Sequence, residues 1–159
     1  MATPSITKKA SSVLDQITAG LNGEENGQQS RQLLSEGFMP LCVEHLHDSK
    51  VRLNTSLRKY PISIYSIAHY GMQNGDLMRD PDMEFMYFPA VLGRTHYWLP
   101  LNYRNDYVGV MTEAMWEDPS SPTGWNHDQP KLNDLIAFWN MWANNIKEQG
   151  FLTNERKAA

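Results

Sequence analysis

A series of short alternating segments in the middle of the chain constrains the fold most. The segments are rich in β-branched and aromatic residues and occupy 62–70, 83–88, 95–103 and 107–116. Turn residues separate them, as at Asn74-Gly75-Asp76, where Asn and Gly accept the positive φ angles of a tight turn. Short strands that are each reached by a turn are typical of an antiparallel meander, so the sequence predicts a sheet of about four or five strands.

An amphipathic helix is predicted to close the fold. Pro130 suits the first turn of a helix, and Gly150 suits the left-handed position after its last turn. Between them, apolar residues recur every three or four positions: Leu132, Leu135, Ile136, Trp139, Trp142, Ala143 and Ile146. A stripe of this kind packs on one face of a sheet. The predicted fold class is therefore α+β, with two layers.

The residues before position 30 predict a mobile polar arm. Residues 1–29 contain no aromatic side chain and only scattered aliphatic ones, so they have little to bury. One short helical segment is expected inside the arm, where apolar residues recur after Ser12 up to Gly23. We therefore expect an arm over 1–29, a single domain over 30–152 and a tail over 153–159.

Local pattern also predicts the structure of two segments at the start of the domain. Residues 32–36 resemble one or two helical turns that end at Gly37. In residues 41–47, Leu41, Val43 and His45 would share one face of a strand, although a helix is an open alternative there.

Composition excludes several classes of protein. The chain has 159 residues, 41% of them hydrophobic, and a formal net charge of −4, which is unlike a wholly disordered protein. A lone Cys42 cannot form an intramolecular disulfide. Neither a membrane-spanning run nor a secretory signal is seen, so we expect a protein of the cytoplasm.

An acidic segment between two predicted strands is the densest group of polar residues. We interpret it as a candidate binding surface for a basic partner, with the alternative that these side chains only stabilise local turns, including one predicted at residues 80–82. Trp125 lies in a loop over 117–128 and either covers the sheet edge or contacts a partner. The candidate binding residues are Asn74, Asp76, Arg79, Asp80, Asp82, Glu84 and Trp125.

The same segment permits a metal site. A hard divalent cation takes oxygen ligands, sometimes with an imidazole, and the candidate ligands are His69, Asp76, Asp80, Asp82 and Glu84. This alternative would make the protein a metal-dependent hydrolase or nuclease, with Glu155 and Lys157 in the tail completing a nuclease-like pattern. No complete catalytic motif is present, so we expect a non-enzymatic protein without a cofactor.

A basic segment supports a second alternative. Arg52, Arg58 and Lys59 lie beside Tyr60, and basic residues next to a stacking aromatic ring are what single-stranded nucleic acid requires. The acidic net charge opposes this interpretation.

The block from Ile62 to Glu84, with its Asn-Gly-Asp-Leu-Met-x-Asp-Pro string at 74–81, resembles a small domain family of unknown function found on phages, plasmids and integrative conjugative elements. Asn105-Asp106-Tyr107 and the segment 142–151 match the resemblance too, which spans about residues 38–152. The resemblance implies an accessory protein of a mobile element that acts by binding a protein of its bacterial host or of a competing element. It implies no catalytic residues.

Overall fold

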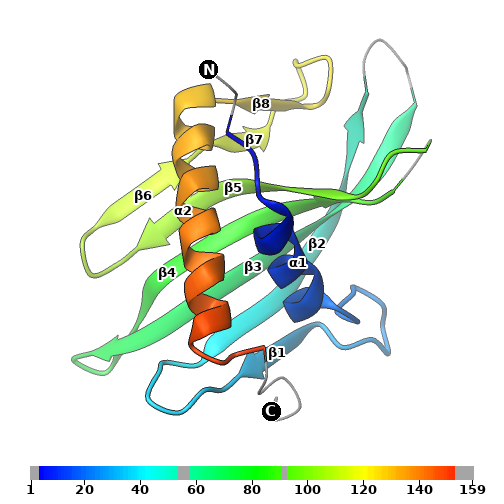
Figure 1. The fold of residues 1–159 in the computed structure, drawn as a ribbon. Helices are drawn as coiled ribbons and strands as arrows, with labels where there is room; N and C mark the ends of the chain where they lie inside the picture. The colour runs from blue at the N-terminus through cyan, green and yellow to red at the C-terminus, as the bar shows by residue number, and fades with distance from the viewer. Residues whose placement is uncertain (1–3, 54–57, 91–92, 153–159) are drawn as a thin grey trace.

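The structure is a computed structural model that describes residues 4–53, 58–90 and 93–152. It contains two helices and eight strands among these residues (Figure 1). In chain order they are α1 (Lys8–Thr18), β1 (Ser30–Leu33), β2 (Leu41–Arg52), β3 (Lys59–Gln73), β4 (Asp76–Phe88), β5 (Tyr97–Asn105), β6 (Val110–Glu113), β7 (Met115–Glu117), β8 (Trp125–His127) and α2 (Gln129–Glu148).

The main sheet is an antiparallel meander, which confirms the predicted fold class. Strands β1 to β6 follow one another in sequence order across the sheet, and β7 and β8 form a separate two-stranded hairpin. The turn between β3 and β4 has positive φ angles at Asn74 (52°) and Gly75 (84°), as the Asn-Gly pair indicates. The main sheet thus has six strands among the described residues, more than the sequence suggested.

Three local predictions were wrong or incomplete. Helical turns were expected over residues 32–36, but residues 32 and 33 belong to strand β1, because Leu33 pairs with Leu41 and becomes fully buried. The turn predicted at residues 80–82 is absent, because β4 continues through Asp80-Pro81-Asp82 while paired to β3 and β5. The open choice at residues 41–47 resolves to a strand that runs on to Arg52.

The helix α2 lies across one face of the sheet, as predicted, and α1 lies beside it on the same face (Figure 1). Asp128 caps α2 at its start, and Gly150 has the left-handed φ of 85° just after its end. The main core lies between these helices and the sheet, where Phe85 and Trp139 pack edge to face with ring centroids 4.8 Å apart.

Helix α1 confirms the short helical segment expected within residues 1–29, and it packs into the main core. It begins after Thr7, whose hydroxyl accepts a hydrogen bond from the Ala10 backbone N–H at 3.1 Å. Its apolar face is buried in the main core through Ala10, Val13, Leu14 and Ile17. The reason is that α2 and the sheet supply the partner surface that so short a helix needs. Residues 8–18 therefore belong to the folded domain.

A smaller apolar cluster lies on the other face of the sheet, at the end near β8. Trp125 is 8% exposed and donates its indole N–H to the Lys50 carbonyl at 3.2 Å. Of the two roles considered for Trp125, the structure therefore shows the covering one. Neither α1 nor α2 is long and apolar enough to cross a membrane, and no other helix is described.

Candidate functional site

Strand alternation divides the acidic segment between two sides of the sheet. Phe85 points toward α2, so its neighbours Glu84 and, one pleat further, Asp82 point away from the helices. Both carboxylates line a cleft of about 210 Å³. We call this side of the sheet the open face, and its cleft is lined by Arg79, Asp82, Glu84, Asn102, Tyr103, Arg104 and Met111.

The two carboxylates of the open face differ in their environment. Asp82 accepts a hydrogen bond from the Ser66 hydroxyl at 2.8 Å, and Glu84 accepts one from the Asn102 side-chain amide. Burial raises the pKa of the Asp82 carboxyl, and the negative charge of Glu84 adds to the rise. Keeping Asp82 ionised at neutral pH therefore costs folding free energy.

Arg79 only partly offsets these charges. Its guanidinium lies 3.8 Å from an Asp82 oxygen and 3.9 Å from an Asp106 oxygen, longer than hydrogen bonds. The Nη1 atom of Arg79 is buried and has no hydrogen-bond partner among the residues that the structure describes. The cleft therefore contains one guanidinium nitrogen that forms no hydrogen bond with the described residues.

The remaining residues of the predicted acidic site have local structural roles. Asn74 forms the β3–β4 turn, and Asp76 is exposed at its end. Asp80 accepts a hydrogen bond from the Asn105 side chain at 3.0 Å, which ties β4 to the end of β5. The predicted binding set is thus brought together only in part, around Arg79, Asp82 and Glu84.

The proposed metal ligands are not brought together. His69 lies on the helix side of the sheet, where it contacts the rings of Trp142 and Phe151 and donates its Nδ1–H to the Pro40 carbonyl at 3.0 Å. Asp82 and Glu84 lie on the opposite side, because their positions alternate with the buried Met83 and Phe85. No group of three or more His, Cys, Asp or Glu side chains in the described part of the chain could hold a metal ion. The pattern Glu155 to Lys157 lies outside the described residues.

His69 should instead make stability depend on pH. Burial lowers its pKa, so below the unfolded value of about 6.5 the unfolded chain takes up a proton that the folded chain does not. Stability is therefore fully present above that pH and decreases as the pH falls toward the folded pKa. Urea unfolding measures the free energy of unfolding at about pH 7.5 and about pH 5.5. Between these two values the free energy should fall less for His69→Gln than for the wild type. An equal loss would assign the pH dependence to other groups.

The basic segment does not form the stacking site that was considered. Tyr60 is only 8% exposed, and the Arg58 guanidinium lies over its ring at 5.4 Å. A buried ring covered by a cation offers no face to a nucleobase. Arg52 and Lys59 line a cavity of about 440 Å³ beside the β7–β8 hairpin. Of the predicted site, the basic side chains therefore share a surface, but the stacking ring does not join them.

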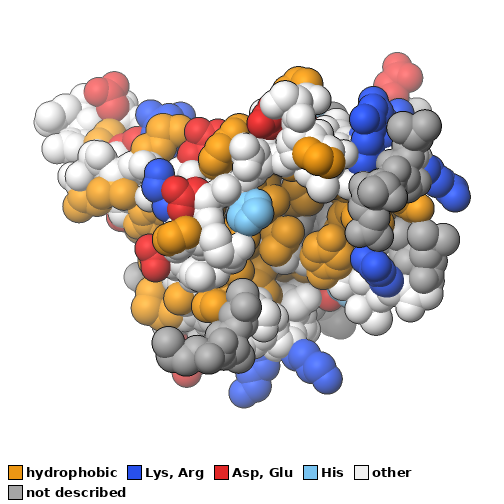
Figure 2. Space-filling view, turned by 90° about the horizontal axis from the view of Figure 1, so that it is seen from above, with side chains coloured by type: hydrophobic (Ala, Val, Ile, Leu, Met, Phe, Trp, Pro, Cys, Tyr) orange, Lys and Arg blue, Asp and Glu red, His pale blue; other side chains and the backbone are white. Residues whose placement is uncertain are grey.

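An apolar hollow lies next to this basic surface. Figure 2 shows hydrophobic side chains gathered at this end of the molecule with Lys and Arg side chains to one side. The hollow measures about 340 Å³, and Phe88 stacks on Tyr97 in its wall with ring centroids 4.9 Å apart. It is a continuation of the smaller apolar cluster toward solvent.

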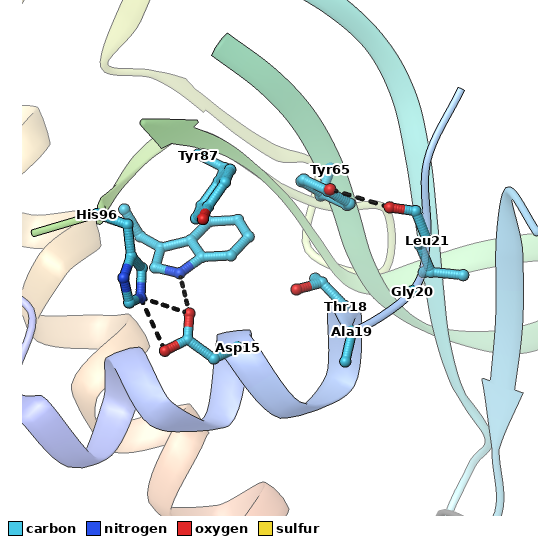
Figure 3. Close-up of a pocket in the computed structure, with 9 residues that line it drawn as sticks. Asp15, Thr18, Ala19, Gly20, Leu21, Tyr65, Tyr87 and His96 are labelled. Carbon is cyan, nitrogen blue, oxygen red and sulfur yellow. Dashed lines mark hydrogen bonds and ion pairs between the residues drawn. The ribbon is translucent and has the colours of Figure 1, made fainter. Parts of the chain in front are cut away.

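A polar pocket that the sequence did not reveal lies between the end of α1 and the sheet (Figure 3). Asp15 of α1 accepts hydrogen bonds from His96 Nε2–H and from the Trp98 indole N–H, each at 2.9 Å. Asp15 and His96 are 81 residues apart, so no local motif could have indicated the pair. The pocket measures about 320 Å³ and is lined by Asp15, Thr18, Ala19, Gly20, Leu21, Tyr65, Tyr87, His96 and Trp98.

Comparison with known proteins identifies the family but no activity. No curated protein and no solved structure matches the chain significantly. One family model matches residues 12–152, and the match includes most of α1, which the sequence resemblance had left outside. Because the match covers most of the 159 residues, the chain belongs to the family described as Domain of unknown function (DUF6908).

Proposed function

We propose that this protein is a non-enzymatic accessory protein that binds another protein through its open face. The single observation that carries the proposal is the composition of that face. Charged residues lie in a cleft of the sheet, and large apolar side chains beside them are left in solvent. Met72, Leu77 and Met111 are 64%, 63% and 66% exposed, respectively.

These apolar side chains are grouped by the fold. Met72 pairs with Leu77 across the end of the β3–β4 hairpin, and Met111 lines the cleft from β6. Methionine side chains adapt to irregular partner surfaces, and exposed apolar groups with polar neighbours are the usual composition of a protein interface. Strand β6 is also the last strand of the main sheet, so its outer edge has no neighbouring strand within that sheet.

The charges of the open face favour a basic partner. Glu44 and Glu113 pair with Ser66 and Asn102, so they share the side of the sheet that carries Asp82 and Glu84. Four acidic residues on this side thus face two basic ones, Arg79 and Arg104. An acidic excess attracts a positively charged protein surface and speeds its association at low salt.

Exposed variants with a matched control can test this surface. Met111→Lys adds a positive charge to the open face, whereas Met141→Lys adds the same charge to the solvent side of α2, where Met141 is 53% exposed. Affinity capture from a host lysate at low salt should recover a protein with the wild type and with Met141→Lys. Met111→Lys should weaken its retention about tenfold, as expected for a central interface residue. Equal retention by both variants, or no specific capture, would contradict the proposal.

Asp82→Asn should separate stability from binding. Because burial raises the pKa of Asp82, removal of its charge is expected to increase the free energy of unfolding at neutral pH, while the amide oxygen still accepts the Ser66 hydrogen bond. The same change removes negative charge from the open face and should weaken capture of the basic partner. Thermal unfolding and captured amount, measured on the same preparation, check the two effects. Increased stability with unchanged capture would leave Asp82 without a binding role.

The setting of this activity follows from the sequence resemblance. Domains similar to the block 62–84 occur on phages, plasmids and integrative conjugative elements, whose small accessory proteins act on host or competing-element proteins. We therefore place the proposed partner among the defence or DNA-processing proteins of the bacterial host or of a competing element. Such proteins often carry basic surfaces because they bind nucleic acid, and these would complement the open face.

A further inference from the structure

We propose that the pocket between the end of α1 and the sheet binds an organic cation, a guanidinium or amidinium group on a short apolar stem. The pocket lies on the helix side of the sheet, so it is separate from the open face (Figures 1 and 3). Two features of its wall favour a positive charge: a fixed carboxylate and aromatic rings.

The carboxylate is held in place by two ring N–H donors. Asp15 receives the His96 Nε2–H on both oxygens and the Trp98 indole N–H on one of them. A carboxylate has about four acceptor positions, and these contacts use three of them, so one position on Oδ2 is left for a donor from solvent. The side chains of Asp15 and His96 are 39% and 37% exposed, which leaves this approach accessible.

Aromatic rings surround the carboxylate. Tyr87 and Tyr65 pack against Trp98 with ring centroids 4.8 Å and 5.4 Å away. Figure 3 shows the carboxylate of Asp15 at one side of the pocket, with Tyr87 above it and Tyr65 opposite. The faces of aromatic rings attract cations and stack on planar cations. The rings and the carboxylate therefore both favour binding of a planar cation. The negative charge of Asp15 also contributes to the raised pKa of Tyr87, after the larger effect of burial.

The end of α1 already binds a cation of this chain and therefore limits the affinity. Ala19 follows the last residue of α1, and the last carbonyl groups of a helix carry a partial negative charge. A guanidinium from this chain already uses that potential, since Arg31 donates to the carbonyls of Ile17 and Ala19. Arg31 does not line the pocket, but its charge nearby opposes a second cation, so we expect millimolar rather than micromolar affinity.

Size limits the ligand to a small group. A volume of about 320 Å³ admits a guanidinium with its stem but not a folded segment. The cation could come from a free small molecule or from an arginine side chain of a peptide. Benzamidine serves as the probe for the first source, and a capped Gly-Arg-Gly peptide for the second. Benzamide and the citrulline peptide are their neutral counterparts of nearly the same shape.

Titration of the full chain followed by NMR tests the proposal. We expect benzamidine to shift the Trp98 indole N–H signal, assigned with Trp98→Phe, and to bind at least about tenfold more tightly than benzamide. Tighter binding of the Arg peptide than of benzamidine would assign the pocket to a protein side chain, and the reverse order to a free small molecule.

Two charge variants provide the matched comparison. Asp15→Asn should weaken binding of benzamidine at least about tenfold, whereas Asp134→Asn, which removes the same charge from an exposed position of α2, should leave it unchanged. Tyr87→Leu, which keeps bulk but removes the ring, should weaken it about threefold.

The titration of the wild-type chain does not depend on whether any variant folds. It can therefore refute the proposal by itself. Equal binding of benzamidine and benzamide would overturn it. So would no shift of the Trp98 signal up to about 10 mM of either cationic probe, where a millimolar Kd gives extensive saturation. Neither outcome affects the proposed role of the open face, which the Met111→Lys comparison tests separately.

Discussion

Trp139→Ala is expected to lower the free energy of unfolding by about 3–5 kcal/mol, the range for loss of a fully buried large aromatic side chain. Trp139 is 0% exposed and packs edge to face on Phe85 of the sheet. It also donates its indole N–H to the Ala10 carbonyl at 3.2 Å, so the variant removes a buried hydrogen bond between α2 and α1. The residue thus joins α2, α1 and the sheet at one point.

Urea unfolding measured by circular dichroism gives this free energy directly. Met141→Ala is the control, because it shortens a side chain of the same helix at a position that is 53% exposed, and it should change stability by less than about 0.5 kcal/mol. If Trp139→Ala cost no more than Met141→Ala, the core between the two helices would not be packed as described.

Predictions from the sequence were most reliable where local pattern and tertiary packing agree. The alternating runs 62–70, 83–88 and 95–103 became strands of the meander, whereas the run 107–116 is divided at Ala114 between β6 of the main sheet and β7 of the hairpin. The stripe from Leu132 to Ile146 became the buried face of α2. Both patterns reflect burial on one side of a regular element, which periodicity reports directly. The turn at Asn74 and Gly75 was found for a similar reason, since its residue types fit the required φ angles.

Predictions failed where long-range pairing overrode local preference. Asp80-Pro81-Asp82 reads as a turn, yet strands on both sides hold it extended within β4. Residues 32 and 33 resemble the start of a helix, yet pairing with β2 makes them a strand. Such outcomes depend on neighbours that are distant in sequence, and propensity is a weak guide there.

The candidate sites also divide into features that local sequence reveals and features that depend on long-range contacts. Asp82 and Glu84 were found from sequence because acidic residues are dense there. That strand β4 places both on one side of the sheet was not predicted, since Asp82 was expected in a turn. His69 could not be excluded as their neighbour until the sheet separated it from them. The pocket around Asp15 was not found at all, since α1, β3, β4 and β5 contribute its walls and its Asp15–His96 contact spans 81 residues.

Deletion of residues 1–21 is expected to abolish cooperative folding. Ala10, Val13, Leu14, Ile17 and Leu21 are each at most 4% exposed and lie in the main core. Full burial of one Val, Leu or Ile side chain contributes about 1.5–3 kcal/mol, so the four larger ones together contribute on the order of the whole stability of a small domain, about 5–15 kcal/mol. The deletion would also expose the surfaces of α2 and the sheet that these side chains cover.

The measurement is the shape of the unfolding curve, supported by dye binding to exposed apolar surface. The deleted chain should unfold gradually and bind the dye, as compact states without fixed packing do. Ile17→Ala should keep a cooperative transition at about 2–5 kcal/mol lower stability, and Lys9→Ala, on the exposed side of α1, should behave as the wild type. A cooperative transition of wild-type stability after the deletion would show that α1 is dispensable, and that residues 1–29 act as the arm that the sequence predicts. Loss of the transition is the result expected from the buried position of α1, which also holds Asp15 and one wall of the cation pocket.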